Sequence, residues 1–175
     1  MSNAVREFST GSLDYPIDAI IVPEAKYSVA EYNDDANYIA TLGLYVCKGL
    51  VLYNPSVKRG LVGHLSYTED LDRSMETMLN AFDSNLRDSE VSVIQTQSNN
   101  GVSLYDHWPS TNTIADYLLN NGANEVNVDL NVDNRFVRGI ALDLKNGNIL
   151  EEVSRDQKYI TSFIWGKSEY IENWW

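Results

Sequence analysis

The amino-acid sequence predicts an α+β fold with mainly antiparallel strands and two helices. Short apolar or alternating runs that end at turn-forming residues recur along the chain, which is typical of strands. Only two stretches space their apolar residues three or four positions apart, as an amphipathic helix does. Asn146-Gly147, between two apolar runs, is the strongest hairpin signal in the chain. A chain of 175 residues is large enough for one domain with a single core.

Short strands are expected throughout the first third of the chain. Pro23 stops the first apolar run, because proline cannot donate to a strand ladder. A polar turn at Asn33-Asp34-Asp35 divides two further runs, and Asn54-Pro55 ends the next one. The expected strands are 17–22, 25–30, 37–44, 49–53 and 60–67. The last two form a strand–loop–strand hairpin that can place Cys47 and His64 side by side.

Two helices and four more strands are expected after this hairpin. Glu69 and Asp70 fall in the first turn of the first helix, where the helix dipole favours acids. Its apolar stripe comprises Leu71, Met75, Met78, Leu79, Phe82 and Leu86. The second helix begins near Ser110 or Thr111 and ends at Gly122 in a C-cap position. The remaining strands are 90–96, 125–131, 136–144 and 148–153, with a long loop at 98–109 and a turn at 145–147.

The ends of the chain differ in character from the middle. We expect an N-terminal arm at 1–16, one domain at 17–156 and an aromatic C-terminal segment at 157–175. Three of the four tryptophans, Trp165, Trp174 and Trp175, lie in that last segment. It either packs back over the domain, which we favour because terminal aromatics need burial, or forms a partner or dimer surface.

Composition narrows the classes of function. Twenty-five acids against thirteen bases give a net charge of −12, which makes nucleic acid an unfavourable partner. No apolar run approaches the ~20 residues that a bilayer-spanning helix needs, and Met1 to Asp14 lacks a secretory-signal layout. A single cysteine suits a reducing compartment, so we expect a cytoplasmic protein without membrane insertion. Export by a route that reads no cleavable signal stays open, as does the oligomeric state.

Cys47 and His64 are the residues that suggest chemistry. A lone thiol cannot form an intramolecular disulfide, and one thiol with two imidazoles makes a poor zinc site. An imidazole can instead take the thiol proton, and the thiolate can attack a carbonyl carbon. The competing interpretation is a buried small hydrophobe among Leu44, Val46 and Leu50. His107 is a second candidate base, and no motif indicates a metal or an organic cofactor.

The segment from Thr41 to Tyr67, TLGLYVCKGLVLYNPSVKRGLVGHLSY, resembles the chemoreceptor glutamine deamidase family, CheD. Members of that family carry a similar Thr-Leu-Gly-Leu-x-x-Cys run. A short apolar strand, an Asp-Pro-like turn and a glycine-containing strand with the catalytic histidine follow. Thr41, Cys47 and His64 fall at the family's spacing, and weaker similarity extends over about residues 17–153. The family belongs to a superfamily of cysteine amidohydrolases with protein N-terminal asparagine amidohydrolases and toxins of the cytotoxic necrotizing factor type.

The resemblance implies a single-domain layered sandwich of mainly antiparallel sheet with two helices. It also implies a Cys–His–Thr triad, in which Cys47 is the nucleophile, His64 the general base and Thr41 the residue that orients the imidazole. The substrate-binding positions would be Tyr45, Val46, Asn100 and Gly101. This chain departs from the family at both pairs: the family has Gly-Ser where Tyr45-Val46 stand, and a differently shaped loop where Asn100-Gly101 stand. No metal or cofactor is implied.

The expected function is therefore cysteine-dependent deamidation of a protein, glutamine to glutamate, with release of ammonia. The substrate would be a chemoreceptor or another protein. Alternatives are an N-terminal asparagine amidohydrolase and a toxin or effector that deamidates host proteins. An alternative of another class is a non-catalytic protein-binding module on the same fold.

Overall fold

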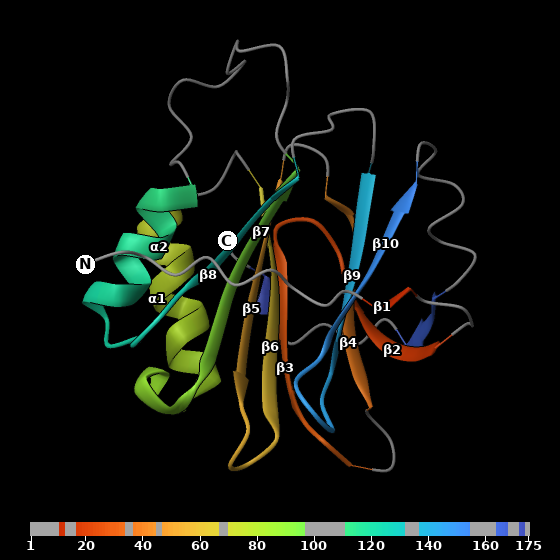
Figure 1. Cartoon of the computed structure of the whole chain (residues 1–175), viewed down its shortest axis with the longest axis horizontal. Coiled ribbons are helices and arrows are strands. Elements are labelled where there is room, and N and C mark those ends of the chain that lie inside the picture. Colours follow the sequence, from red (N-terminus) through yellow and green to blue (C-terminus); the bar gives the residue numbers. More distant parts are fainter. Residues whose placement is uncertain are drawn as a thin grey trace, which may run out of the picture.

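Two six-stranded sheets and two α-helices make up the described part of the protein, as seen in a computed structural model of the whole chain (Figure 1). The structure describes residues 11–12, 17–33, 37–44, 47–66, 70–96, 111–131, 137–154, 164–167 and 172–173. Sheet A has the order β1 (Gly11–Ser12), β10 (Ile149–Ser154), β9 (Val137–Asp143), β4 (Tyr38–Leu44), β2 (Ile17–Val22), β11 (Ile164–Lys167). Sheet B has the order β12 (Glu172–Asn173), β3 (Lys26–Glu31), β6 (Arg59–Leu65), β5 (Lys48–Asn54), β7 (Glu90–Thr96), β8 (Asn127–Asn131).

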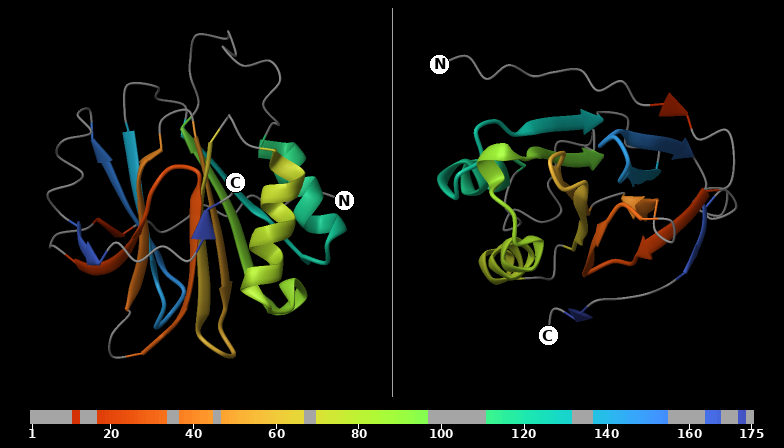
Figure 2. Two further views of the ribbon diagram at one scale, coloured as in Figure 1. Left: turned by 180° about the vertical axis from the view of Figure 1, so that it is seen from behind. Right: turned by 90° about the horizontal axis from the view of Figure 1, so that it is seen from below.

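The elements form three layers. Figures 1 and 2 show α1 (Leu71–Phe82) and α2 (Thr111–Asn120) on one face of sheet B, with sheet A against its other face. Both sheets are mixed: β2–β4 and β7–β8 are parallel pairs, whereas β4–β9, β3–β6, β5–β6 and β5–β7 are antiparallel. The predicted α+β layered sandwich with two helices is thereby confirmed.

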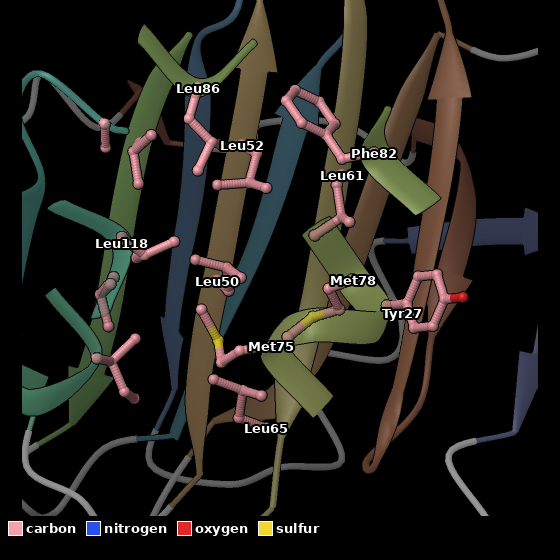
Figure 3. Close-up of a cluster of buried hydrophobic side chains, with 14 of the residues drawn as sticks. Tyr27, Leu50, Leu52, Leu61, Leu65, Met75, Met78, Phe82, Leu86 and Leu118 are labelled. Carbon is pink, nitrogen blue, oxygen red and sulfur yellow. The ribbon is translucent and has the colours of Figure 1, made fainter. Parts of the chain in front are cut away.

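The largest core cluster lies between the helices and sheet B (Figure 3). Met75, Met78 and Phe82 of α1 point onto the strands, where they meet Leu50 and Leu61. Every residue of β5 is buried, because helices cover one face of the strand and sheet A covers the other. The middle of β5, from Leu50 to Tyr53, is accordingly a continuous apolar run rather than an alternating one.

A second core cluster fills the space between the two sheets. It joins Val51, Val62 and Ile94 of sheet B to Ile39 and Ile140 of sheet A. Side chains in this space are buried from water, so a polar atom there that lacks a hydrogen-bond partner costs free energy. This cost governs the site described below.

Most predicted elements are present at or near their expected bounds. Strands β2 and β7 match the predicted 17–22 and 90–96, and α2 begins at Thr111 as expected. Gly122 follows α2 with a φ of 106°, and Gly147 has a φ of 79° in the predicted turn between β9 and β10. The other predicted strands differ from their expected bounds by one or two residues at an end, the usual uncertainty of element boundaries, and β1, β11 and β12 were not predicted.

The end of α1 was predicted wrongly. The apolar stripe suggested a helix reaching Leu86, but α1 ends at Phe82, and Asp83 adopts a left-handed conformation with φ 45°. Leu86 lies instead in a separate 3-10 helix, η1 (Leu86–Asp88), and still packs on the same core. Asp70 is also not a first-turn residue but the N-cap, whose side chain accepts from the backbone N–H of Arg73.

Short strands from both ends of the chain extend the sheets. β1 pairs with β10, β11 pairs with β2, and β12 pairs with β3. The aromatic side chains of the segment 157–175 lie outside the described residues, so the expected packing of these aromatics and the three-part division of the chain stay predictions. Within the described ranges, neither α1 nor α2 is long and apolar enough to cross a membrane.

Candidate active site

Two of the crossings from sheet A to sheet B, β2 to β3 and β4 to β5, lie at one end of the sandwich. Residues 23–25 join β2 to β3, and Cys47 directly precedes β5. Val22 at the end of β2 pairs with Thr41 near the end of β4, and His64 near the end of β6 pairs with both Lys26 and Gly49. This end lies opposite the β5–β6 turn (Figure 1).

Thr41 of sheet A and His64 of sheet B are joined by a hydrogen bond across the two sheets. The Thr41 Oγ1 to His64 Nδ1 distance is 2.7 Å, and the same hydroxyl donates to the carbonyl oxygen of Val22 at 2.7 Å. A hydroxyl carries a single proton. Because Thr41 gives its proton to Val22, it must accept from His64, which assigns the imidazole proton to Nδ1.

This assignment leaves Nε2 of neutral His64 with a free lone pair. Nε2 is buried and has no hydrogen-bond partner among the described residues. His64 is 2% exposed, and burial lowers the pKa of its imidazole to about 4, an effect that the carboxylate of Glu24 opposes. At neutral pH the side chain is therefore an uncharged base with its acceptor atom unused.

Cys47 directly precedes β5, at the same end of sheet B as His64. It lies one position before the Lys48–Leu65 pair, so its direct neighbour across β5 and β6 is Ser66, and His64 is the diagonal neighbour on the same face. Cys47 Sγ donates to Glu24 Oε1 at 3.6 Å, and Ser66 Oγ donates to the same carboxylate oxygen at 2.6 Å. Glu24 thus joins the thiol to the strand that carries the imidazole.

Local backbone geometry brings these side chains to the crossings. Ala25 adopts a left-handed conformation with φ 58°, and its N–H donates to the His64 carbonyl oxygen at 3.0 Å, which ties the Glu24 turn to β6. In β4 a bulge places one extra residue between Thr41 and Leu44, and Gly43 with φ 80° accommodates it. Bulges bend a strand, and this one precedes the crossing to Cys47.

Gly49 sits directly across from His64 and permits the sheets to meet there. A Cβ at this position would lie 2.9 Å from Ile140 Cδ1 and 3.0 Å from Leu44 Cδ1. Side chains of sheet A therefore occupy the space that any larger residue at position 49 would need. The imidazole is enclosed by this apolar packing, which is the physical cause of its lowered pKa.

Lys48 adds an unusual buried amine next to the thiol. Its side chain is 1% exposed and, by the alternation of β5, points to the opposite face from Cys47. Burial lowers its pKa to about 8, and the Cys47 thiolate would oppose this shift.

Three of the seven predicted site residues can be located. Thr41, Cys47 and His64 come together at this end, and Thr41 contacts His64 through its side chain as the triad prediction requires. The four predicted substrate-binding positions, Tyr45, Val46, Asn100 and Gly101, lie outside the described residues, as does the competing base His107.

Sequence reasoning missed Glu24, Ser66 and Lys48. Ser66 follows His64 by two positions, so strand alternation alone predicts that both face the same side. Glu24 carried only a weak signal, an acid after the proline that ends a buried strand. No group of three or more histidines, cysteines and acids suited to a metal ion occurs in the described ranges.

Comparisons with known proteins assign no family. No protein-family model matches the chain, and no curated protein matches it in sequence. Among solved structures, the crystal structure of the Bacillus licheniformis hypothetical protein YfiH is similar with a TM-score of 0.42 and 11% sequence identity. The match covers 69% of this chain and 65% of that one, so this chain spans less than two-thirds of that protein's length. A likeness of this size carries no information about function.

Proposed function

We propose that this protein is a cysteine-dependent protein amidohydrolase that converts a side-chain carboxamide, glutamine to glutamate, with release of ammonia. The observation that carries the proposal is the hydrogen bond between Thr41 and His64, which leaves Nε2 as an unused buried acceptor on the strand face that His64 shares with Cys47, the only cysteine of the chain. The resemblance of Thr41, Cys47 and His64 to the CheD pattern supports it. The same chemistry on asparagine gives aspartate, as in the N-terminal asparagine amidohydrolases.

In the first half-reaction the Cys47 proton moves to Nε2 of His64, and the thiolate attacks the carboxamide carbon. A carbon–sulfur bond forms while the carbonyl electrons move onto oxygen. Thr41 Oγ1 accepts a hydrogen bond from Nδ1–H throughout, so the ring keeps the orientation that Nε2 needs. The imidazolium then gives its proton to the amide nitrogen, the carbon–nitrogen bond breaks, and ammonia leaves a thioester on Cys47.

In the second half-reaction water replaces ammonia. His64 takes a proton from water, and the resulting hydroxide adds to the thioester carbon. The carbon–sulfur bond breaks, the acid is released, and the proton returns from the imidazole to Sγ. One water is consumed and one ammonia is produced for each carboxamide, and no metal or cofactor takes part. The low pKa of His64 keeps the imidazole neutral between turnovers, when it must act as the base.

The test is ammonia release from a defined mixture of glutamine- and asparagine-containing peptides, with the converted residue located by mass spectrometry. We expect activity in the wild type and in His107→Gln, and its loss in Cys47→Ser and His64→Ala with folding retained. Retention of full activity in Cys47→Ser would rule out the mechanism. His107→Gln is the matched control, because it removes the other imidazole of the chain.

One observation favours the second candidate, a non-catalytic protein-binding module. The contact between Glu24 and Sγ keeps the thiol proton on sulfur in the resting protein, since a carboxylate repels a neighbouring thiolate. Alkylation of Cys47 by iodoacetamide separates the two functions. A nucleophile reacts near neutral pH in the folded protein, whereas a thiol that serves only packing reacts after unfolding.

A further inference from the structure

Glu24 brings an unneutralised negative charge to the candidate nucleophile. The side chain is exposed, its Oε1 accepts from both Cys47 Sγ and Ser66 Oγ, and Oε2 has no hydrogen bond within the described part of the chain. In that same part the one ion pair joins Arg59 to Glu31, so no lysine or arginine pairs with Glu24. Ser66 therefore holds the carboxylate against the thiol without reducing its charge.

This arrangement opposes the first step of the proposed reaction. Formation of the Cys47 thiolate puts a second negative charge 3.6 Å from Glu24 Oε1, and the two charges repel each other. A cation that pairs with Glu24 removes this repulsion and releases Oε1 from the thiol. The Sγ proton then has the unused Nε2 of His64 as its acceptor.

We propose that Glu24 is a specificity-determining residue that binds a cationic group of the substrate close to the carboxamide under attack. The inference rests on the proposed amidohydrolase function for the carboxamide, but the preference for a cation follows from Glu24 itself. Substrate binding and thiol activation are coupled, because the group that selects the substrate also removes the charge that keeps Cys47 protonated.

The distance between Glu24 and Cys47 limits how far the cationic group of the substrate can be from the carboxamide under attack. A nitrogen cation lies about 2.7–2.9 Å from a carboxylate oxygen that it pairs with. Since Glu24 Oε1 is 3.6 Å from Sγ, the cation lies within a few ångströms of the carboxamide carbon that Sγ attacks. Two sources satisfy this condition: the α-ammonium of a chain-terminal glutamine or asparagine, and the side chain of a lysine or arginine beside an internal one.

The deciding experiment measures the charge preference of Cys47 with methanethiosulfonate reagents that carry an ammonium, a neutral or a sulfonate group. The thiolate displaces methanesulfinate from the reagent and forms a mixed disulfide, and Cys47 is the only cysteine in the chain. We expect the cationic reagent to react about tenfold or more faster than the anionic one, as charge-lined sites do for counter-ions. Glu24→Gln should reduce this ratio to near unity, and Glu24→Lys should invert it.

Glu125→Gln is the matched control, because Glu125 is exposed, lies before β8 and changes the net charge by the same amount. It should keep the wild-type ratio, which separates the local effect of Glu24 from the overall charge of −12. If Glu24→Gln keeps the wild-type ratio as well, the inference is wrong. This experiment requires no deamidation, so its result is independent of the proposed function.

Four peptides distinguish the sources of the cation: terminal glutamine with a free or an acetylated α-amine, and internal glutamine beside lysine or alanine. We expect the preferred cationic member of a pair to exceed its neutral partner about tenfold in kcat/KM, a difference that Glu24→Gln removes. If none of the four is hydrolysed while the labelling ratio depends on Glu24, the amidohydrolase function fails and the cation preference of the site stands. Equal rates on all four peptides would contradict the inference.

Discussion

Replacing Thr41 with valine removes one hydroxyl that serves two buried partners. Oγ1 donates to the Val22 carbonyl oxygen and accepts from His64 Nδ1, each at 2.7 Å, and Thr41 has no exposed surface. Valine keeps the shape and the strand preference of threonine. The change therefore removes a hydrogen-bond partner from two buried groups, the Val22 carbonyl oxygen and the His64 Nδ1–H.

The expected loss in the free energy of unfolding is about 2–4 kcal/mol, because each buried polar group left without a partner costs roughly 1–3 kcal/mol. The loss is measured by urea denaturation. Thr77→Val is the matched control: Thr77 also donates to a backbone carbonyl, that of Arg73, but at a half-buried position of α1 near the surface. There we expect a change within ~0.5 kcal/mol, as for most surface substitutions.

The second measurement is the protonation of each imidazole nitrogen by ¹⁵N NMR, with His107→Gln used to assign His64. In the wild type at neutral pH the imidazole proton should be on Nδ1 and not on Nε2, since Nδ1–H donates a hydrogen bond to Thr41 Oγ1. Thr41→Val should give a mixture of the two tautomers and a deamidation rate about 10- to 1,000-fold lower. A wild-type spectrum with the proton on Nε2, or a Thr41→Val protein as stable as the Thr77→Val control, would refute the reasoning.

Three further predictions concern stability. Burial lowers the pKa of His64 from 6.5 to about 4, so the unfolded chain takes up a proton between these pH values that the folded protein does not. The free energy of unfolding should then fall by about 3 kcal/mol more in the wild type than in His64→Asn as the pH drops from 6.5 to 4. Urea titrations at each pH measure it, and equal pH slopes would contradict it. Burial also lowers the pKa of Lys48 from 10.5 to about 8, so the stability from its neutral amine is complete above pH 10.5 and is lost as the pH falls through 8. Relative to Lys48→Met, the wild type should therefore gain about 3 kcal/mol in the free energy of unfolding between pH 8 and pH 10.5, and equal pH slopes for the two proteins would contradict this. Asp83→Gly should stabilise the protein by about 0.5–1 kcal/mol, because the left-handed C-cap of α1 suits glycine; a lower melting temperature would argue against this.

Much of the secondary structure could be predicted because its causes are local. Pro23 limits β2, Asn146-Gly147 forms the turn between β9 and β10, and Gly122 follows the end of α2, each through the preferences of one or two residues. The failure at Leu86 has a complementary cause. Its spacing continued the apolar stripe, and both a longer helix and a chain that turns at Asp83 bury it in the same core. Periodicity reports burial and cannot choose between these two paths.

The candidate site divides in the same way. The sequence by itself brought Cys47, His64 and Thr41 to attention, because their residue types and spacing resemble a known catalytic pattern. Only the tertiary structure decided which contacts they make. Thr41 and His64 are on different sheets, and Glu24 meets Cys47 and Ser66 because two crossings between the sheets end at the same place. Three features depend on partners distant in the chain: the hydrogen bond that the Thr41 hydroxyl donates to Val22, the unused acceptor Nε2 of His64, and the Glu24 carboxylate beside Cys47. Such contacts are set by the packing of two sheets that exclude water between them, and no local preference encodes that packing.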